Sequence, residues 1–151
     1  MPEAGAEAPE FELADQAGGK VALKDLRGQW VVLYFYPRAD TPGCTTQACS
    51  VRDRSSEYAA RGARVLGVSP DEVEAIAKFD DKYGLGFTLL ADPDHAVAEA
   101  YGAWIEKSMY GKKYMGIERS AFLIDETGAI AEAWYKISPA NTPKNLLAAL
   151  A

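Results

Sequence analysis

The sequence predicts an α/β fold in which a central mixed β-sheet is flanked by helices on both faces and preceded by an N-terminal β-hairpin. Short apolar runs alternate along the chain with segments of helical pattern. The first two main runs are apolar almost throughout, as strands covered on both faces are. A turn at Glu126-Thr127-Gly128 joins the last two runs, which adds antiparallel strands to a core of parallel ones.

Each element follows from a local pattern. A weaker early pair of runs supplies the hairpin, and β-rich runs supply the sheet, so we expect strands over 11–13, 20–23, 31–36, 64–69, 87–91, 120–125 and 130–135. Between them, segments that begin after Pro or Asp and close at Gly predict helices over 43–62, 71–84 and 94–102. A last helix is expected over 143–151, and 103–118 is expected to be a long loop packed onto the domain.

The length and the net charge of the chain limit the classes of function that it can have. The 151 residues, 48% hydrophobic, suit one domain spanning 1–151. The formal charge of −6 argues against nucleic acid as a partner, because phosphate binding needs a clustered basic face. No export signal is visible at the N-terminus, and the longest apolar run is far shorter than the roughly 20 residues that span a bilayer. We therefore expect a cytoplasmic protein that does not enter membranes.

Both cysteines lie in one stretch, 36-YPRADTPGCTTQACS-50. The cytoplasm keeps thiols reduced, so this pair is expected to be catalytic or metal-binding rather than a permanent disulfide. A structural zinc site needs four ligands, and the chain offers only Cys44, Cys49 and the single His95, so we expect no metal. The remaining alternative is two buried cysteines that act only as small apolar side chains.

The position of the pair favours redox chemistry. Thr41-Pro42-Gly43 separates a strand from a helix and places Cys44 in the first helical turn. Free N–H groups and the helix dipole favour the thiolate there, which is the nucleophilic form. Ideal helix geometry puts the Cα atoms of Cys44 and Cys49 roughly 8.5 Å apart and about 140° round the axis. A disulfide needs about 7 Å or less, so the two thiols can join only if the helix unwinds.

The motif Pro37-x3-Thr41-x2-Cys44 resembles the peroxidatic motif of peroxiredoxins. The longer stretches 34-YFYPRADTPGCTTQAC-49 and 118-ERSAFLIDETG-128 resemble the subfamily of bacterioferritin comigratory protein and peroxiredoxin Q. This resemblance implies a thioredoxin-like fold and thiol-dependent reduction of hydrogen peroxide and organic hydroperoxides. It also implies thioredoxin or a similar thiol as the reductant, and no cofactor.

The resemblance assigns roles to individual residues. Cys44 matches the peroxidatic cysteine, which becomes a sulfenic acid, and Cys49 matches the resolving cysteine that forms a disulfide with it. Thr41 matches the threonine whose hydroxyl contacts the thiolate and the peroxide. Arg119 matches an arginine brought beside Cys44 from a distant strand.

The same resemblance describes the substrate pocket. Pro37 and Pro42 match prolines that shield and shape it, and the N–H groups of Gly43 and Cys44 are expected to bind the developing negative charge with Arg119. One position departs from the subfamily, which usually has Glu where this chain has Gln47. We expect its amide still to accept a hydrogen bond from Arg119, but to hold that arginine less firmly.

Two rival functions stay open from the sequence. A thiol-disulfide exchange protein would use the same thiols, although it normally presents Cys-x2-Cys at a helix start. A redox-sensing binding module would use them only as a sensor. We expect a monomer. The aromatic and Met side chains of segment 103–118 are expected to pack onto the domain, with a cover over the active-site mouth as the alternative.

Overall fold

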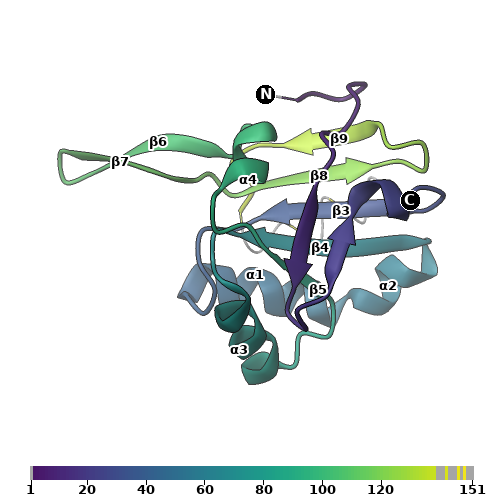
Figure 1. Ribbon diagram of the computed structural model, residues 1–151, viewed down its shortest axis with the longest axis horizontal. Helices are drawn as coiled ribbons and strands as arrows, with labels where there is room; N and C mark the ends of the chain where they lie inside the picture. The colour runs from purple at the N-terminus through teal and green to yellow at the C-terminus, as the bar shows by residue number, and fades with distance from the viewer. Residues whose placement is uncertain (1, 139–141, 143–145, 147, 149–151) are drawn as a thin grey trace.

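The computed structural model describes residues 2–138 together with 142, 146 and 148. Its central feature is a seven-stranded sheet with the order β2-β1-β5-β4-β3-β8-β9 (Figure 1). These strands are β1 (Glu12–Asp15), β2 (Lys20–Ala22), β3 (Trp30–Phe35), β4 (Ala63–Ser69), β5 (Thr88–Ala91), β8 (Ser120–Ile124) and β9 (Ile130–Trp134). The helices are α1 (Pro42–Asp53), α2 (Ser55–Ala60), α3 (Val73–Tyr83), α4 (Ala96–Ala100) and a short 3-10 helix, η1 (Leu23–Leu26).

The sheet is mixed, as predicted. Strands β3, β4 and β5 run parallel to one another, because each is joined to the next by a helical crossover. Strand β8 pairs antiparallel with β3, and β9 pairs antiparallel with β8. The predicted N-terminal hairpin is also confirmed, since β1 and β2 pair antiparallel and β1 then adds to the edge of β5.

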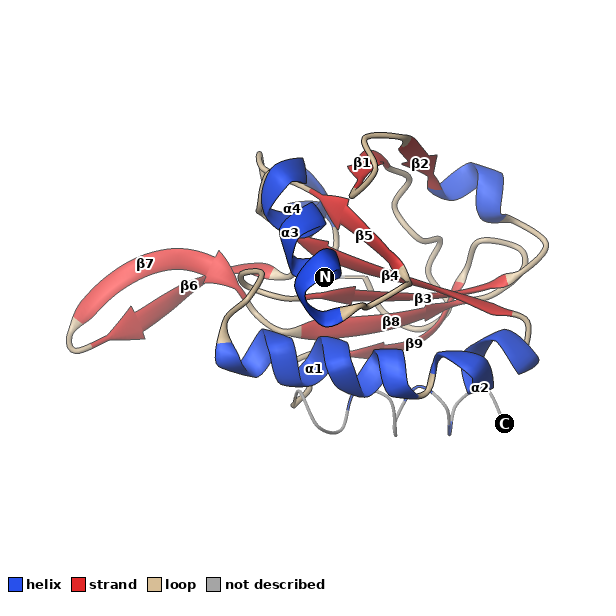
Figure 2. Ribbon diagram, turned by 90° about the horizontal axis from the view of Figure 1, so that it is seen from below, coloured by secondary structure: helices blue, strands red, loops and turns tan. Residues whose placement is uncertain are grey.

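Helices cover both faces of the sheet. Successive side chains of β3 point to opposite faces, so this strand contributes to a buried cluster on each side. Its odd-numbered residues, such as Leu33 and Phe35, enter a buried cluster with side chains of α4 and η1. Its even-numbered residues, such as Val32 and Tyr34, enter a second cluster with side chains of α1, α2 and α3. Figure 2 shows α1 and α2 running along one face. A continuously apolar strand is therefore required here.

The structure divides one of the predicted helices. The helix predicted over 43–62 is two helices, because the backbone of Arg54 leaves helical geometry with ψ 15°. The break allows both Val51 on α1 and Tyr58 on α2 to be buried against the curved sheet. The predicted final helix over 143–151 lies mostly outside the described residues, of which Leu146 and Ala148 are helical.

The prediction of a packed loop over 103–118 is wrong. This segment forms a separate antiparallel hairpin of β6 (Trp104–Met109) and β7 (Lys112–Ile117), which projects from the body of the molecule (Figures 1 and 2). Tyr110 and Gly111 make its two-residue turn, both with positive φ (51° and 79°), a geometry that suits tight hairpins. Met109, Tyr110, Tyr114 and Met115 are exposed, so they do not pack onto the domain.

Among the described residues, no helix combines the length and the apolar character that crossing a bilayer would require.

Candidate active site

Cys44 lies in the first turn of α1, at the end of the sheet where β3 finishes, as the sequence predicts. Thr41 is the N-cap residue in an extended conformation, and Pro42 occupies the first helical position, where a missing N–H costs nothing. The first intrahelical hydrogen bond is donated by Thr45 to the carbonyl of Thr41. The N–H groups of Gly43 and Cys44 therefore lack an acceptor within the helix, and Cys44 itself is buried, with 2% of its surface exposed.

Arg119 contacts Cys44 across 75 positions of sequence. Its Nη2 donates to the Cys44 Sγ at 3.5 Å. The sheet produces this contact, because β8 pairs antiparallel with β3 so that Ser120 lies opposite Phe35. Arg119 directly precedes Ser120 and is thus held at the same end of the sheet as the start of α1. The structure confirms that the arginine singled out in the sequence lies beside the cysteine.

Gln47 is fully buried one turn along α1 and belongs to a chain of hydrogen bonds. Its Oε1 accepts from Arg119 Nη1 at 2.6 Å, which confirms the expected contact. Its Nε2 donates to Thr142 Oγ1 at 2.8 Å, and the Thr142 hydroxyl donates in turn to the carbonyl of Ser138 at 2.9 Å. Sequence reasoning missed Thr142, which is 95 positions from Gln47 and has no motif around it. An amide fits this chain because it both accepts and donates, whereas a glutamate has no hydrogen for Thr142.

The remaining predicted residues surround Cys44 less directly. The Thr41 hydroxyl donates to the carbonyl of Arg38 at 2.9 Å and not to the sulfur. Pro37 is half-buried, Pro42 is exposed and Gly43 is half-buried. The structure therefore brings the side chain of Arg119 to the sulfur and joins it to the buried Gln47, and it shows no such contact for Pro37 or Pro42 among the described residues.

Cys49 lies further along α1, half-buried, and packs against the same buried cluster as Cys44. Both thiols are free. The helix between them is continuous from Pro42 to Asp53, so the structure is that of the reduced protein with α1 intact.

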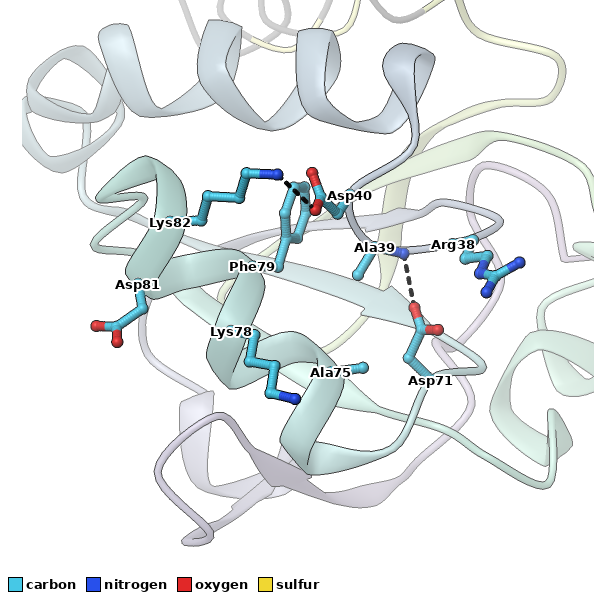
Figure 3. A pocket seen from close by; sticks show the side chains of 9 residues that line it. All are labelled: Arg38, Ala39, Asp40, Asp71, Ala75, Lys78, Phe79, Asp81 and Lys82. Carbon is cyan, nitrogen blue, oxygen red and sulfur yellow. Dashed lines mark hydrogen bonds and ion pairs between the residues drawn. The ribbon is translucent and has the colours of Figure 1, made fainter.

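A hollow of about 630 Å³ lies between the loop before α1 and helix α3 (Figure 3), and neither Cys44 nor Arg119 lines it. Asp71 accepts the Ala39 N–H at 2.7 Å, and Asp40 accepts from Lys82 Nζ at 2.9 Å and from the Tyr83 hydroxyl at 2.7 Å. The bonds from Lys82 and then from Tyr83 lower the pKa of Asp40. These contacts hold the loop that leads to Cys44 against α3 and the segment before it.

Metal-ligating side chains are dispersed in the described part of the chain, where no three His, Cys, Asp or Glu side chains are gathered as a metal would need. His95 instead stacks on Trp104, with ring centroids 3.9 Å apart and an interplanar angle of 1°. It is the N-cap residue of α4.

The comparisons with known proteins agree with this geometry. The model of the AhpC/TSA family matches residues 4–133. Peroxiredoxin Bcp of Bacillus subtilis is 48% identical over 135 residues, which cover 89% of this chain and 86% of that protein. The chain belongs to the peroxiredoxin family. It is accordingly a thiol-dependent peroxidase, an oxidoreductase.

Solved structures show the same fold. Peroxiredoxin Q of Xanthomonas campestris superposes with a TM-score of 0.89 and 40% identity over 93% of this chain and 89% of that chain. The bacterioferritin comigratory protein of the same organism, described for its alkyl peroxide reduction activity, gives a TM-score of 0.88 at 39% identity with the same coverage. The predicted thioredoxin-like fold of this peroxiredoxin is thus confirmed.

Changing Gln47 to Glu is expected to lower the fraction of Cys44 present as thiolate at neutral pH. The new carboxylate would place a negative charge beside the sulfur and would lose the donor that bonds Thr142. Thiolate absorbance followed against pH in a Cys49→Ser background measures this fraction. Gln29→Glu, at the opposite end of β3, makes the same charge change as a control. A larger thiolate fraction in the Gln47 variant would contradict the expectation.

Proposed function

We propose that the chain reduces hydrogen peroxide and organic hydroperoxides at Cys44, resolves the product with Cys49, and is recycled by thioredoxin or a similar dithiol. The observation that carries this proposal is the hydrogen bond from the Arg119 guanidinium to the sulfur at the N-terminus of α1. The alkyl peroxide reduction reported for the similar Xanthomonas campestris protein supports organic hydroperoxides as substrates.

The first step is a displacement at oxygen. The Cys44 thiolate attacks one peroxide oxygen, the S–O bond forms, and the O–O bond breaks, so that the sulfur is oxidised to a sulfenic acid. The bonding pair leaves with the second oxygen, which becomes water or an alcohol after taking a proton from solvent. Negative charge therefore moves from the sulfur to the departing oxygen during the step.

The residues around Cys44 are arranged to receive that charge. Arg119 and the N–H groups of Gly43 and Cys44, which have no acceptor within α1, are donors fixed before the reaction, the condition under which electrostatic stabilisation is strongest. The hydrogen bond to Gln47 fixes the guanidinium in turn. We propose that Thr41 turns its hydroxyl from the Arg38 carbonyl toward the bound peroxide, while Pro37 and Pro42 shield the pocket.

The second step is condensation. The Cys49 thiol attacks the sulfenic sulfur, a disulfide forms, and water leaves. An intact helix holds the two thiols too far apart for this bond, so α1 must unwind between them. Both ends of the helix are tied to α3, through Asp40 before it and through Arg52 Nη1, which donates to the Tyr83 carbonyl at 2.6 Å. We propose that unwinding is confined to the stretch between these ties, which contains both cysteines.

The third step returns the protein to its dithiol form. A thioredoxin dithiol would attack the Cys44–Cys49 disulfide, and it becomes oxidised as both thiols are released. We propose that the reaction takes place in the cytoplasm, where protein thiols are kept reduced. Cys44, Cys49 and Arg119 all come from one chain, so the proposed active unit is a monomer.

Intact-mass measurement after one equivalent of peroxide tests the assignment of the two cysteines. Wild type is expected to lose two hydrogens by forming an intramolecular disulfide, because Cys49 intercepts the sulfenic acid. Cys49→Ser is expected to retain oxygen on Cys44, and Cys44→Ser is expected to remain unmodified. An intermolecular disulfide in wild type would overturn the role of Cys49. Insulin reduction without peroxide consumption would instead support a thiol-disulfide exchange protein.

A further inference from the structure

The β6–β7 hairpin carries the exposed apolar surface of the molecule. In the part of the chain that the structure describes, four large hydrophobic side chains are exposed, and all four lie on this hairpin: Met109, Tyr110, Tyr114 and Met115. Tyr110, at the turn, is 99% exposed. Single exposed apolar side chains are common on proteins, but a group gathered at one projecting point indicates an interaction surface (Figure 1).

Tyr110 is an unusual residue for the turn that it occupies. Tyr110 and Gly111 both have positive φ, the geometry of a hairpin turn that favours Asn, Asp or Gly at its first position. A bulky side chain at positive φ is disfavoured, and this one gains no packing in return because it is almost fully exposed. The turn therefore does not explain the tyrosine, whereas a partner that takes up its ring does.

The charge of the hairpin is opposite to that of the whole chain. Residues 104–117 contain three lysines and one acidic residue, Glu106, whereas the formal charge of the chain is −6. Glu106 pairs with Lys113 at 3.6 Å between exposed groups, a contact that contributes little in water. Among the described residues, no ion pair involves Lys112. The hairpin is therefore attracted to an anionic surface, while the acidic body of the molecule is repelled from one.

The apolar side chains lie on both faces of the hairpin, which favours a lipid surface over a protein partner. Tyr114 and Met115 are consecutive residues of β7, so their side chains point to opposite faces. A protein seated on one face would leave the other in water, whereas lipid headgroups surround a projecting tip from all sides. Tyrosine is also enriched where membranes meet water, because its ring is apolar and its hydroxyl is polar.

We propose that the tip of this hairpin, residues 109–115, binds the surface of an anionic lipid bilayer. Lys112 and Lys113 contact the lipid phosphates, and the apolar side chains of the tip enter the headgroup region. The strand edges keep the contact shallow, because backbone groups without partners are costly in hydrocarbon. The contact is peripheral, since none of the described helices could cross a bilayer. The cytoplasmic leaflet of a membrane carries the negative surface charge that such a contact needs.

The fold sets the orientation of the bound protein. The hairpin projects from the end of the molecule at which α1 begins (Figure 2), and a hollow of about 430 Å³ beside its base is lined by Lys107, Lys136 and Arg119 among others. Attachment at the tip therefore turns the end of the protein that holds Cys44 toward the lipid. This inference goes beyond the proposed function and does not depend on it, because lipid binding needs neither a reactive thiol nor a peroxide.

Co-sedimentation with phosphatidylcholine vesicles that contain or lack phosphatidylglycerol tests the proposal. Wild type is expected to bind the anionic vesicles. Its partition coefficient is expected to fall by at least about tenfold when phosphatidylglycerol is left out and in Lys112→Gln/Lys113→Gln, because lysines near an anionic surface supply the attraction. Added salt is expected to weaken binding for the same reason. Lys20→Gln/Lys24→Gln, on β2 and η1, is the matched control and is expected to bind as wild type does.

Tyr110→Asn separates the lipid contact from the structure of the hairpin. Asparagine suits positive φ better than tyrosine, so the thermal unfolding midpoint of the variant is expected to equal or exceed that of wild type. Its partition coefficient for anionic vesicles is nevertheless expected to fall by about tenfold, because the aromatic ring is lost. Tyr110→Trp is expected to keep wild-type binding, since tryptophan is equally suited to the membrane interface.

The proposal is overturned if wild type does not bind anionic vesicles, or if Tyr110→Asn or the Lys112/Lys113 variant binds them as wild type does. If wild type is a dimer that Tyr110→Asn converts into monomers, the tip contacts a second copy of the chain, and the lipid contact falls. Peroxide consumption in the absence of vesicles tests the proposed function separately. Cys44→Ser is expected to bind vesicles as wild type does, so either proposal can fail without the other.

Discussion

Replacing Cys44 by serine is expected to abolish peroxide consumption while leaving the fold intact. A serine hydroxyl is not ionised at neutral pH, so the donors around position 44 would have no anionic nucleophile to act with. The side chain is buried and nearly isosteric with cysteine, so the packing of α1 against the sheet is expected to persist. Steady-state peroxide consumption with thioredoxin and its reductase measures the effect, and circular dichroism checks the fold.

Cys49→Ser is the matched control for that variant, because it makes the same change in the same helix. It is expected to consume one equivalent of peroxide at the wild-type rate and then to stop or overoxidise, since Cys49 acts only in the second step. Residual catalytic turnover in Cys44→Ser would contradict the role of Cys44. Loss of the single equivalent in Cys49→Ser would show that the two thiols do not have separate roles.

Replacing Arg119 by glutamine is expected to slow the reaction of Cys44 with peroxide by about 10²- to 10³-fold, the usual effect of removing a donor to a developing oxyanion. Arg119 donates to the Cys44 sulfur at 3.5 Å and to Gln47 Oε1 at 2.6 Å, and it supplies the positive charge between these two residues. Its loss removes a cation that favours both the thiolate and the charge on the leaving oxygen. Stopped-flow measurement of the second-order rate constant with hydrogen peroxide gives the effect directly.

Two further variants separate charge from geometry at this position. Arg119→Lys keeps the charge but loses the planar fork that bonds Gln47 and Cys44 together, so only partial activity is expected. Arg64→Gln removes an arginine on β4 whose Nη2 bonds Thr88 Oγ1, and its rate is expected to match wild type. If the rate constant of Arg119→Gln stays within about threefold of wild type, the slowing is far smaller than expected, and Arg119 has no part in the mechanism.

The fold was largely predictable because its signals are local. Apolar runs, helix-closing glycines and the turn at Glu126-Thr127-Gly128 act over a few residues, and the structure confirms the mixed sheet, the N-terminal hairpin and the position of Cys44. The prediction for segment 103–118 was wrong because its strands are exposed at most positions and lack the apolar alternation of half-buried strands. Its clearest signal was the turn at Tyr110-Gly111, which sequence reasoning passed over.

The site residues that belong to a sequence motif were predictable, whereas those that join the site only through a tertiary contact were not. Arg119 and Gln47 could be named from the resemblance, but the partner of Gln47 could not, because Thr142 has no local pattern around it. The direction of the Thr41 hydroxyl likewise depends on the path of the loop through Arg38. Contacts between segments tens of residues apart depend on the register of strands and the docking of helices, which local signals do not specify.

The sequence alone determined which groups are proposed to do the chemistry. Thr41 as the N-cap residue and Pro42 at the first helical position start α1 two residues before Cys44. A second thiol, Cys49, lies five residues further along, where an intact helix keeps it away from the first. The tertiary structure decided what surrounds the sulfur. The pairing of β8 with β3 brings Arg119 to Cys44, the buried amide of Gln47 joins that arginine to Thr142, and the hairpin β6–β7 adds a cationic hollow beside them. The physical reason is that a helix start is fixed by neighbouring residues, whereas an electrostatic environment is fixed by every segment packed against it.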